Sequence, residues 1–519
     1  MRICRKATYH SPCSHPEETR MPHPISAEEL ARNATQTAVG RTNFIGRTAL
    51  DTAARRAAIE AIAARLTEEK IDVVRVCFVD TQGQVRLHAI EARHFAQAAR
   101  NGVAFTTALL AMDSANLIYQ NVFSADGGFG HAHMGGAGDM MALPDPATFR
   151  ILPWAPKTGW VLSDLYLING ERCPFDPRWV MQKACTALES LGLSFVGGAE
   201  VEFHVFKVMD PHNELEHCTQ PARPPAVIAL RHGYQYMNDQ ITDAMEPVTT
   251  ALRDALLGMQ LPVRTLETEW GPGQLEVTLD PLIGVATADA IIMLRTTVKQ
   301  VARRIGLVAS FMAKPNLPNI FSSGWHLHQS LVNHTTGANV FAADNELLSE
   351  TGRHYVGGLL QHVRAGTAFS NPTINGYKRL NANPLSPKRA VWSNDNKAAM
   401  CRLVGGHGDP ATRIENRIGE PAANPYLYMA SQIFSGIDGI THQKDPGPPL
   451  NDNPYAQTQM EVLPGSLLEA IDALANSKLL AETMGEAFVA HFVAQKRHEI
   501  SRFMSTVTDW EQNEYFEMF

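Results

Sequence analysis

The sequence predicts an α+β protein with a small β-rich N-terminal domain and a larger C-terminal domain. Three observations support this prediction. The chain has 519 residues, enough for two or more domains. Short runs of β-branched and aromatic residues recur along it, and after about residue 170 they alternate with helix-like segments. The content of 45% hydrophobic and 19% charged residues is ordinary for a globular protein.

Composition and charge exclude several classes of protein. The net charge of −8 argues against a general nucleic-acid binder. There is no run of 18 or more apolar residues, so we expect no membrane-spanning helix and no membrane partner. The seven cysteines are scattered and form no CxxC pair, which is typical of a reducing compartment, and we predict a cytoplasmic location.

The N-terminal part is predicted to be a mobile extension, residues 1–50, followed by a small β-rich domain, residues 51–170. The extension is polar, rich in His, Pro, Ser and Thr, and without sustained periodicity. The elements expected in the domain are a helix over 52–69, a β-hairpin over 71–90, a loop with six glycines over 124–143, and strands over 150–154 and 159–168.

The C-terminal domain, residues 171–519, is predicted to begin with a helix. Asp176 followed by Pro177 is a helix cap with proline at the first helical position. That helix leads to a strand-forming run over 197–205. Further helices are expected over about 247–259, 285–305, 345–364, 424–437 and 467–500, with a long loop over 442–459.

The run 197–205, GGAEVEFHV, carries the most informative pattern in the chain. Side chains two residues apart in a strand share a face, so Glu200 and Glu202 point one way and the apolar residues point the other. Glutamate is rarely buried unless it is paired or binds a metal. Taken alone, such a pair most often lines a solvated strand face.

Two more carboxylates flank a turn in LETEWGPGQLEV, residues 266–277. Glu269 and Glu276 are seven residues apart, so on one regular strand they would face opposite ways. The Gly-Pro-Gly between them predicts a turn, and a turn interrupts the two-residue alternation of side-chain directions along a strand. Both carboxylates can therefore reach one site, although two solvated acids beside a turn are the alternative.

Two other strand-like segments carry imidazoles and charges on one face. His326 and His328, in SSGWHLHQSL, have a metal-ligand spacing, but a hydrogen-bonded pair is an equal alternative. Arg413, Glu415 and Arg417 alternate within TRIENR, where a solvated strand edge is the alternative. Upstream lies a cationic group: Lys378, Arg379, Lys388, Arg389, Lys397 and Arg402. If the faces converge, they suit Mg²⁺ or Mn²⁺ beside a polyphosphate and a carboxylate substrate.

Five separated motifs occur in the order typical of one family: GAEVEF, EWGPGQLEV, SSGWHLHQSL, NPTINGYKRL, and TRIENR followed by ANPYL. On these motifs the chain resembles glutamine synthetase and its relatives, the γ-glutamyl amine ligases, over residues 71–500. The resemblance implies an N-terminal β-grasp domain and a catalytic domain with an open, funnel-like β-barrel flanked by helices. It also implies a homo-oligomer of stacked rings, such as a dodecamer, with active sites between subunits.

The resemblance further implies ATP and L-glutamate as substrates and at least two divalent ions, Mg²⁺ or Mn²⁺, in each site. The expected ligands of one ion are Glu202, Glu269 and Glu276, and those of the other are Glu200, His326 and Glu415. The expected phosphate-binding residues are His328, Lys397, Arg402 and Arg413. Lys397 replaces the usual arginine, which keeps the charge but loses bidentate geometry.

The remaining roles implied by the resemblance concern glutamate and the amine. Arg379 and Arg417 match the arginines that grip the glutamate carboxylates. Tyr234 resembles the tyrosine near the amine, and Asp126 is expected to enter the active site of a neighbouring subunit. Asp126, Tyr234, Arg379 and Lys397 are therefore the expected catalytic residues.

One loop departs from the ammonia-using members of the family. They carry a glutamate after the Tyr-Lys-Arg-Leu motif, but here Leu385 falls at that position, and Phe321 replaces a usual polar residue. Leu385 cannot hold ammonium, whereas burying it against an apolar amine would be worth about 1.5–3 kcal/mol. We therefore predict ATP-dependent ligation of glutamate to an apolar alkyl or aromatic amine, such as aniline, through γ-glutamyl phosphate. Ammonia-using glutamine synthesis and a catalytically inactive homologue are the alternatives.

Overall fold

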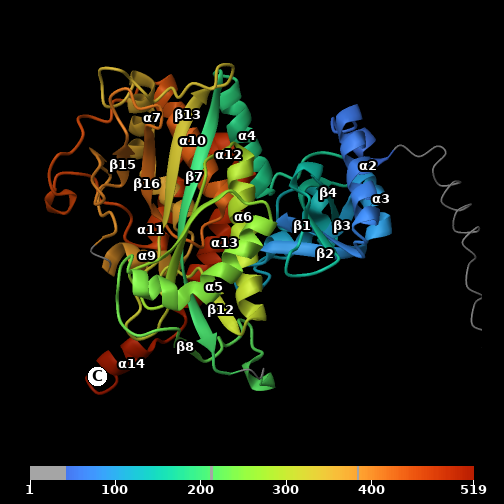
Figure 1. The fold of residues 1–519 in the computed structure, drawn as a ribbon, viewed down its shortest axis with the longest axis horizontal. Helices are drawn as coiled ribbons and strands as arrows, with labels where there is room; N and C mark the ends of the chain where they lie inside the picture. The colour runs from blue at the N-terminus through green and yellow to red at the C-terminus, as the bar shows by residue number, and fades with distance from the viewer. Residues whose placement is uncertain (1–42, 211–213, 383–384) are drawn as a thin grey trace, which may run out of the picture. The chain divides into compact units, whose positions relative to one another are not determined.

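The computed structural model describes residues 43–210, 214–382 and 385–519. It contains two β-sheets, of six and ten strands, and many helices, so the predicted α+β class is confirmed (Figure 1). The six-stranded sheet falls within residues 73–167 and the ten-stranded sheet within residues 193–419. In the part of the chain that is described, none of the helices combines the length and apolar character of a membrane span.

Most of the predicted N-terminal extension, residues 1–42, lies outside the described residues. Its remaining part includes a 3-10 helix, Phe44–Arg47. Within this helix Ile45 is buried and packs with Leu143 and Tyr166. The 3-10 helix is therefore packed against the β-rich region that follows it.

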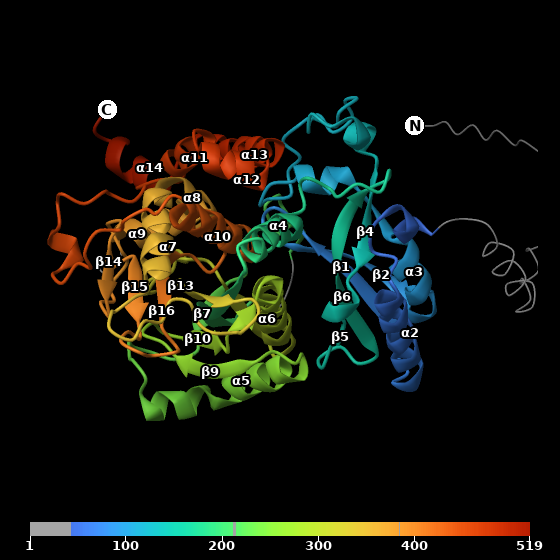
Figure 2. The same cartoon turned by 90° about the horizontal axis from the view of Figure 1, so that it is seen from above.

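The six-stranded sheet has the strand order β2-β1-β6-β4-β3, with β5 paired to β6. β1 and β2 form the predicted hairpin, and β1 runs parallel to β6. The predicted helix is confirmed as α2 (Ala53–Glu68), whose start is capped by the Thr52 side chain. Figure 2 shows α2 and α3 on one face of this sheet. The other elements are β1 (Val73–Val79), β2 (Val85–Glu91), α3 (Phe95–Asn101), β3 (Val103–Thr106), β4 (Asp139–Pro144), β5 (Arg150–Ile151) and β6 (Thr158–Leu167).

The predicted loop over 124–143 is wrong in its last five residues, which belong to strand β4. β4 lies between β3 and β6 and pairs antiparallel with both, so the sheet satisfies its backbone groups. The six glycines of the segment all precede Asp139, and the alternation of buried Met140 and Ala142 after them was the overlooked strand signal. The predicted strand over 150–154 is also shorter, because only Arg150 and Ile151 pair.

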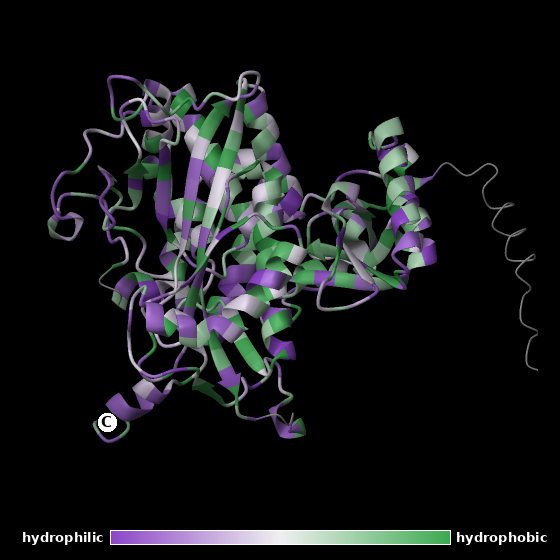
Figure 3. Ribbon diagram, viewed as in Figure 1, coloured by the Kyte–Doolittle hydropathy of each residue, from purple (hydrophilic) through white to green (hydrophobic). Residues whose placement is uncertain are grey.

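The ten-stranded sheet is built around β7 (Leu193–Val208), which pairs with β13 and β10 on its two sides. Buried and partly exposed residues alternate along β7 from Phe195 to Phe203, and the hydropathy colouring shows apolar and polar residues along the strand (Figure 3). The strand order is β14-β15-β16-β13-β7-β10-β9, and β8, β11 and β12 also pair with β7. The bounds are β8 (Val227–Ala229), β9 (Val263–Thr268), β10 (Gln274–Leu279), β11 (Leu282–Ile283), β12 (Leu307–Ser310), β13 (Trp325–Asn333), β14 (Trp392–Asn394), β15 (Cys401–Val404) and β16 (Arg413–Gly419).

Helices cover the ten-stranded sheet, and two of the predicted helices differ from the structure at their starts. α5 (Asp239–Gly258) begins earlier than 247, because Asn238 caps it and Pro247 lies inside it rather than at its start. The helix predicted over 345–364 begins only at α7 (Glu350–Gln361), after which α8 (Val363–Ser370) follows.

The helix predicted over 467–500 is in fact three helices. Ser477 caps the second of them, and Gly485, which separates the second from the third, has φ +111°, a conformation that favours glycine. The three are α11 (Leu467–Ala475), α12 (Lys478–Met484) and α13 (Glu486–Met504). The remaining helices are α4 (Pro177–Glu189), α6 (Val285–Arg304), α9 (Ile374–Ala382), α10 (Pro425–Thr441) and α14 (Asp509–Tyr515).

A buried ionic cluster surrounds Arg178 at the start of α4. The guanidinium contacts the carboxylates of Asp145 at 2.7 Å, Asp164 at 2.5 Å and Asp289 at 2.9 Å. The hydroxyl of Tyr426 donates a hydrogen bond of 2.6 Å to Asp289. Because Asp164 belongs to β6, Asp289 to α6 and Tyr426 to α10, this cluster ties the six-stranded sheet to the helices around the ten-stranded one.

Candidate active site

The register of the ten-stranded sheet places the acidic residues beside one another. Glu202 on β7 is directly opposite Glu276 on β10, which is itself opposite Glu267 on β9. Glu200, two residues before Glu202, is directly opposite His326 on β13. Opposed residues project to the same face of a sheet with about 4.5–5.5 Å between their Cβ atoms. The structure therefore gathers these five side chains on one face.

A second row on the same face combines an imidazole, a carboxylate and cations. His328 on β13 is opposite Glu415 on β16, and Glu415 is opposite Arg402 on β15. One Glu415 oxygen accepts a hydrogen bond of 2.8 Å from Arg402, and the other contacts Arg417. Arg413 donates a hydrogen bond of 3.1 Å from Nε to Nδ1 of His328. The predicted phosphate-binding residues of these strands thus adjoin the carboxylates.

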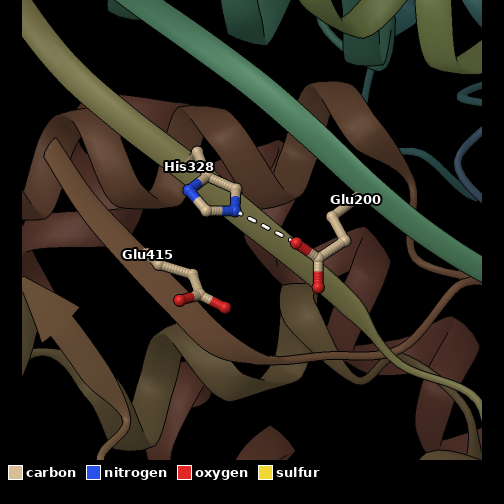
Figure 4. Close-up of side chains that lie close together, drawn as sticks. All are labelled: Glu200, His328 and Glu415. Atoms are coloured by element: carbon tan, nitrogen blue, oxygen red, sulfur yellow. Dashed lines mark hydrogen bonds and ion pairs between the residues drawn. The ribbon is translucent and has the colours of Figure 1, made fainter. Parts of the chain in front are cut away.

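Two groups of side chains bring possible metal-ligand atoms within 4.8 Å of one another: Glu200, His328 and Glu415, and Glu200, Glu276 and His326. Figure 4 shows the first group, whose members come from β7, β13 and β16 and face one another. Glu200 Oε1 lies 2.5 Å from His326 Nδ1, and Glu200 Oε2 lies 3.4 Å from His328 Nε2. Carboxylate oxygens with an imidazole are a donor set that fits Mg²⁺ or Mn²⁺.

Several of these carboxylates are crowded and partly desolvated. Burial, and then the charge of Glu269, raises the pKa of Glu202 to about 8. Burial, together with Glu200 and Glu202, also raises the pKa of Glu276. Burial opposes ionisation of Glu200 too, but the neighbouring His326 outweighs it and holds the pKa of Glu200 below its usual range. A bound divalent cation would relieve this crowding, since opposite charge favours the ionised carboxylates.

The remaining predicted cations lie at different depths. The Arg379 guanidinium is buried and donates hydrogen bonds to the carbonyls of Arg417, Ile418 and Gly419. Among the described residues, no carboxylate forms an ion pair with Arg379. Lys397 is exposed, and its charge acts on Glu269. Arg379 therefore places a buried positive charge near the acidic face, and Lys397 places an exposed one there.

An aromatic cluster, defined here as Tyr234, Tyr236, Trp270 and Phe321, adjoins the acidic face. The Phe321 ring centroid lies 6.3 Å from that of Tyr234 and 6.3 Å from that of Trp270, which lies 6.0 Å from that of Tyr236. The Trp270 amide donates a hydrogen bond of 2.9 Å to a carboxylate oxygen of Glu269. Both tyrosines and Trp270 remain 45–46% exposed. The cluster is therefore a partly open apolar surface beside the carboxylates.

Two predicted site residues, Asp126 and Leu385, lie in turns rather than on the strands that form this face. Leu385 is 59% exposed and directly follows residues 383–384, which lie outside the described part of the chain. Asp126 accepts hydrogen bonds from Ser124 at 2.6 Å and from the Gly128 amide at 3.0 Å, both within its own loop. The roles of Leu385 and Asp126 stay predictions.

Sequence reasoning missed Gln274 and Glu267 on this face. Gln274 is buried and donates a hydrogen bond of 3.1 Å to Oε2 of Glu202. Gln274 precedes Glu276 by two residues, so the strand period alone was enough to place it on this face. Glu267 needed the register of the β9–β10 hairpin, which places it opposite Glu276. The side chains of Tyr236 and Trp270 had no periodic signal that pointed to the site.

Comparisons with known proteins agree with this geometry. Residues 174–515 match the family described as "Glutamine synthetase, catalytic domain". A γ-glutamylanilide synthase from an Acinetobacter species is 39% identical over 499 residues, covering 92% of this chain and 99% of the relative. A glutamine synthetase from Methanosarcina mazei is 33% identical over 463 residues, covering 87% and 96%. A solved structure described as a GmaS/ADP complex is similar with a TM-score of 0.74 at 30% identity, covering 88% of this chain and 99% of that one.

Proposed function

Since the chain belongs to the glutamine synthetase family and is a carbon–nitrogen ligase, we propose that it joins the γ-carboxylate of L-glutamate to an apolar organic amine, with aniline as the representative substrate. ATP would supply the phosphoryl group, and the products would be a γ-glutamylamide, ADP and phosphate. The observation that carries the choice of amine is the aromatic cluster beside Glu269. The similarity to a γ-glutamylanilide synthase supports the same choice.

The family resemblance also supports proposals on domains and assembly. We infer that residues 51–170 form a β-grasp domain and residues 171–519 the catalytic domain, because each sheet falls within one range. We further propose a ring-shaped homo-oligomer, in which Asp126 acts in the active site of a neighbouring subunit. The five cysteines among the described residues are free thiols, which supports a cytoplasmic location.

In the proposed mechanism, the cations on this face hold the two anionic substrates. Arg379 and Arg417 would hold the carboxylates of glutamate, and the ATP phosphates would contact His328, Lys397, Arg402 and Arg413. A γ-carboxylate oxygen attacks the γ-phosphorus, and the bond from phosphorus to the bridging oxygen of ADP breaks. The amine nitrogen then attacks the acyl carbon of γ-glutamyl phosphate, loses a proton and displaces phosphate. The guanidinium groups stabilise the charge that develops on the transferred phosphoryl group.

The carboxylates and the imidazole gathered on this face would hold the divalent ions, and the family resemblance divides them between two sites. We propose Glu202, Glu269 and Glu276 for one ion and Glu200, His326 and Glu415 for the other. When bound, the ions would neutralise phosphate charge.

Mn²⁺ with ATP is expected to raise the melting temperature, because ligand binding stabilises the folded state by about 2.7 kcal/mol at 100 times the Kd. Differential scanning fluorimetry with and without a chelator measures the shift. A melting temperature that is the same in both conditions would contradict the proposed metal sites.

The aromatic cluster favours an amine that carries an apolar group. An aromatic amine is weakly basic, so it arrives neutral at pH 7 and requires no strong base in the site. Contact between aromatic rings is worth about 0.5–1.5 kcal/mol beyond the area that it buries. An ammonium ion gains nothing from such area burial and must first lose a proton.

The proposed function is tested by measuring phosphate release with ATP, glutamate and a panel of amines. We expect kcat/KM to be higher for aniline or isopropylamine than for ammonium or putrescine. Ammonium as clearly the best substrate would overturn the choice of amine and indicate glutamine synthesis. No phosphate release with any amine would refute the ligase reaction itself.

Trp270→Ala is expected to lower kcat/KM for aniline about tenfold, since a lost aromatic contact of roughly 1.5 kcal/mol corresponds to that factor. Steady-state kinetics with aniline and with ammonium measure the change, and the ammonium reaction should change little. Trp510→Ala is the control, because Trp510 lies on α14 and is 62% exposed. An equal loss with both amines would show that Trp270 does not select the amine.

A further inference from the structure

We infer that Gln274, Ser323 and His204 form a buried hydrogen-bond chain that positions Glu202 as a metal ligand. The inference rests on the proposed function, because it assumes that Glu202 binds a divalent ion. All three side chains are nearly inaccessible to solvent, with exposed fractions of 0–1%. Gln274 lies on β10, Ser323 in the segment before β13, and His204 on β7. The hydrogen-bond chain therefore links two paired strands through a residue outside them.

Gln274 has only one possible orientation in this chain. Its Oε1 accepts a hydrogen bond of 2.9 Å from the Gly271 amide, which can only donate. Its Nε2 therefore faces the Glu202 carboxylate at 3.1 Å and the Ser323 hydroxyl at 3.0 Å. An ionised carboxylate only accepts, and so does the Ser322 carbonyl, which lies 3.2 Å from Nε2. Exchange of the amide oxygen and nitrogen would therefore break the contacts with Glu202 and Ser322.

Ser323 joins Gln274 to His204. Its hydroxyl oxygen accepts a hydrogen bond from Gln274 Nε2 and forms a second hydrogen bond of 3.2 Å with His204 Nδ1, in which the tautomer of the imidazole decides the donor. His204 is directly opposite Gln274 across the β7–β10 pair, and its ring stacks on Phe206 with an interplanar angle of 2°. The rigid imidazole thus anchors the far end of the chain.

The near end of the chain fixes one oxygen of Glu202. Oε2 accepts from Gln274 Nε2 and also from the Gly324 amide at 2.9 Å. Oε1 lies 4.0 Å from His326 Nε2, on the side of the candidate metal ligands. A glutamate side chain otherwise has several rotamers to lose on binding. Holding Oε2 by two donors therefore presents Oε1 in one orientation, as supporting residues around metal sites commonly do.

Gln274→Met removes the donor to Glu202 at nearly constant volume. We expect it to raise the Kd for Mn²⁺ about 10–100-fold, the usual effect of losing a supporting residue at a metal site. Isothermal titration calorimetry with Mn²⁺ alone measures this affinity without depending on the amine or on turnover. Urea denaturation of the metal-free proteins measures the structural cost separately.

Gln329→Met is the matched control. Gln329 is equally buried, donates to Gln432 at 3.2 Å and accepts from Tyr355 at 2.8 Å, but it lies on the opposite face of β13 from His326 and His328. We expect it to lower the urea midpoint and leave the Mn²⁺ affinity unchanged. Equal Mn²⁺ affinities for Gln274→Met and the wild type would overturn the inference, as would an equal loss of affinity in the control.

A second pair of variants acts at the far end of the chain. His204→Phe keeps an aromatic ring but removes the hydrogen-bond partner of Ser323, whereas His204→Asn offers an amide that can donate or accept in its place. We expect weaker Mn²⁺ binding for His204→Phe and recovery for His204→Asn. The same affinity for both variants would contradict a role for the hydrogen bond. If the wild type binds no Mn²⁺, the proposed metal sites fail first, and the two failures are thereby distinguished.

Discussion

Replacement of Glu200 by glutamine is expected to lower the rate of glutamate-dependent phosphate release roughly 10²–10³-fold, the loss typical of removing one electrostatic stabiliser from an active site. Glu200 is the one residue common to both groups of possible metal ligands. It also contacts His326 at 2.5 Å and His328 at 3.4 Å. The amide removes a negative charge and places an NH₂ group or a neutral oxygen against these imidazoles. Phosphate release at saturating Mn²⁺, ATP and glutamate measures the loss.

Glu267→Gln is the control for this experiment. Glu267 lies on the same face, opposite Glu276, yet it belongs to neither group of ligand atoms. A small effect in Glu267→Gln beside a large one in Glu200→Gln would support direct coordination by Glu200. Comparable losses in both would indicate that the total negative charge of the face matters rather than the identity of the ligand.

Arg178→Met is expected to lower the free energy of unfolding by about 3–5 kcal/mol, the cost of breaking a buried ionic cluster from one side. The methionine would leave the carboxylates of Asp145, Asp164 and Asp289 without the guanidinium that now contacts all three. Arg172 would still contact Asp164 at 3.1 Å and Tyr426 would still donate to Asp289, but the cluster would lose a positive charge, and its carboxylates would have to take up protons or admit water. Urea denaturation followed by circular dichroism measures the change.

Arg353→Met tests whether burial is the reason for the large loss of stability expected in Arg178→Met. Arg353 forms an ion pair of 2.8 Å with Asp445, but the two side chains are 39% and 72% exposed. Exposed pairs contribute about 0–1 kcal/mol, so the urea midpoint should barely move. Similar shifts for Arg178→Met and Arg353→Met would mean that the Arg178 cluster does not depend on its desolvated position.

The strand faces could be predicted from the sequence because they depend only on neighbouring residues. Glu200 with Glu202, and His326 with His328, follow directly from the two-residue period of a strand. Gln274 obeys the same period relative to Glu276, but an uncharged side chain between Glu269 and Glu276 does not by itself indicate a site. Which strands are neighbours, in contrast, is set by long-range pairing, and the motifs suggested it only through the family resemblance.

Other features were beyond a local pattern. The sequence pattern predicts a helix that begins at Pro247, because proline is common at the first helical position. In the structure Asn238 caps α5, and Pro247 lies inside the helix. The roles predicted for Leu385 and Asp126 would require a closed loop and a neighbouring subunit, respectively. Neither expectation can be derived from residue spacing, because spacing does not show how a loop closes or which surfaces of two copies of a chain meet.

Glu200 is directly opposite His326, and Glu202 is directly opposite Glu276. This register limits where residues can be inserted into the chain or deleted from it. One inserted residue within β7 ahead of Ala199 would turn Ala199 and Val201 toward the substrates and send both acids into the apolar interior. Insertions in β7 should therefore abolish activity and folding together, whereas the largely exposed loop over 442–459 is a place where relatives can gain or lose residues.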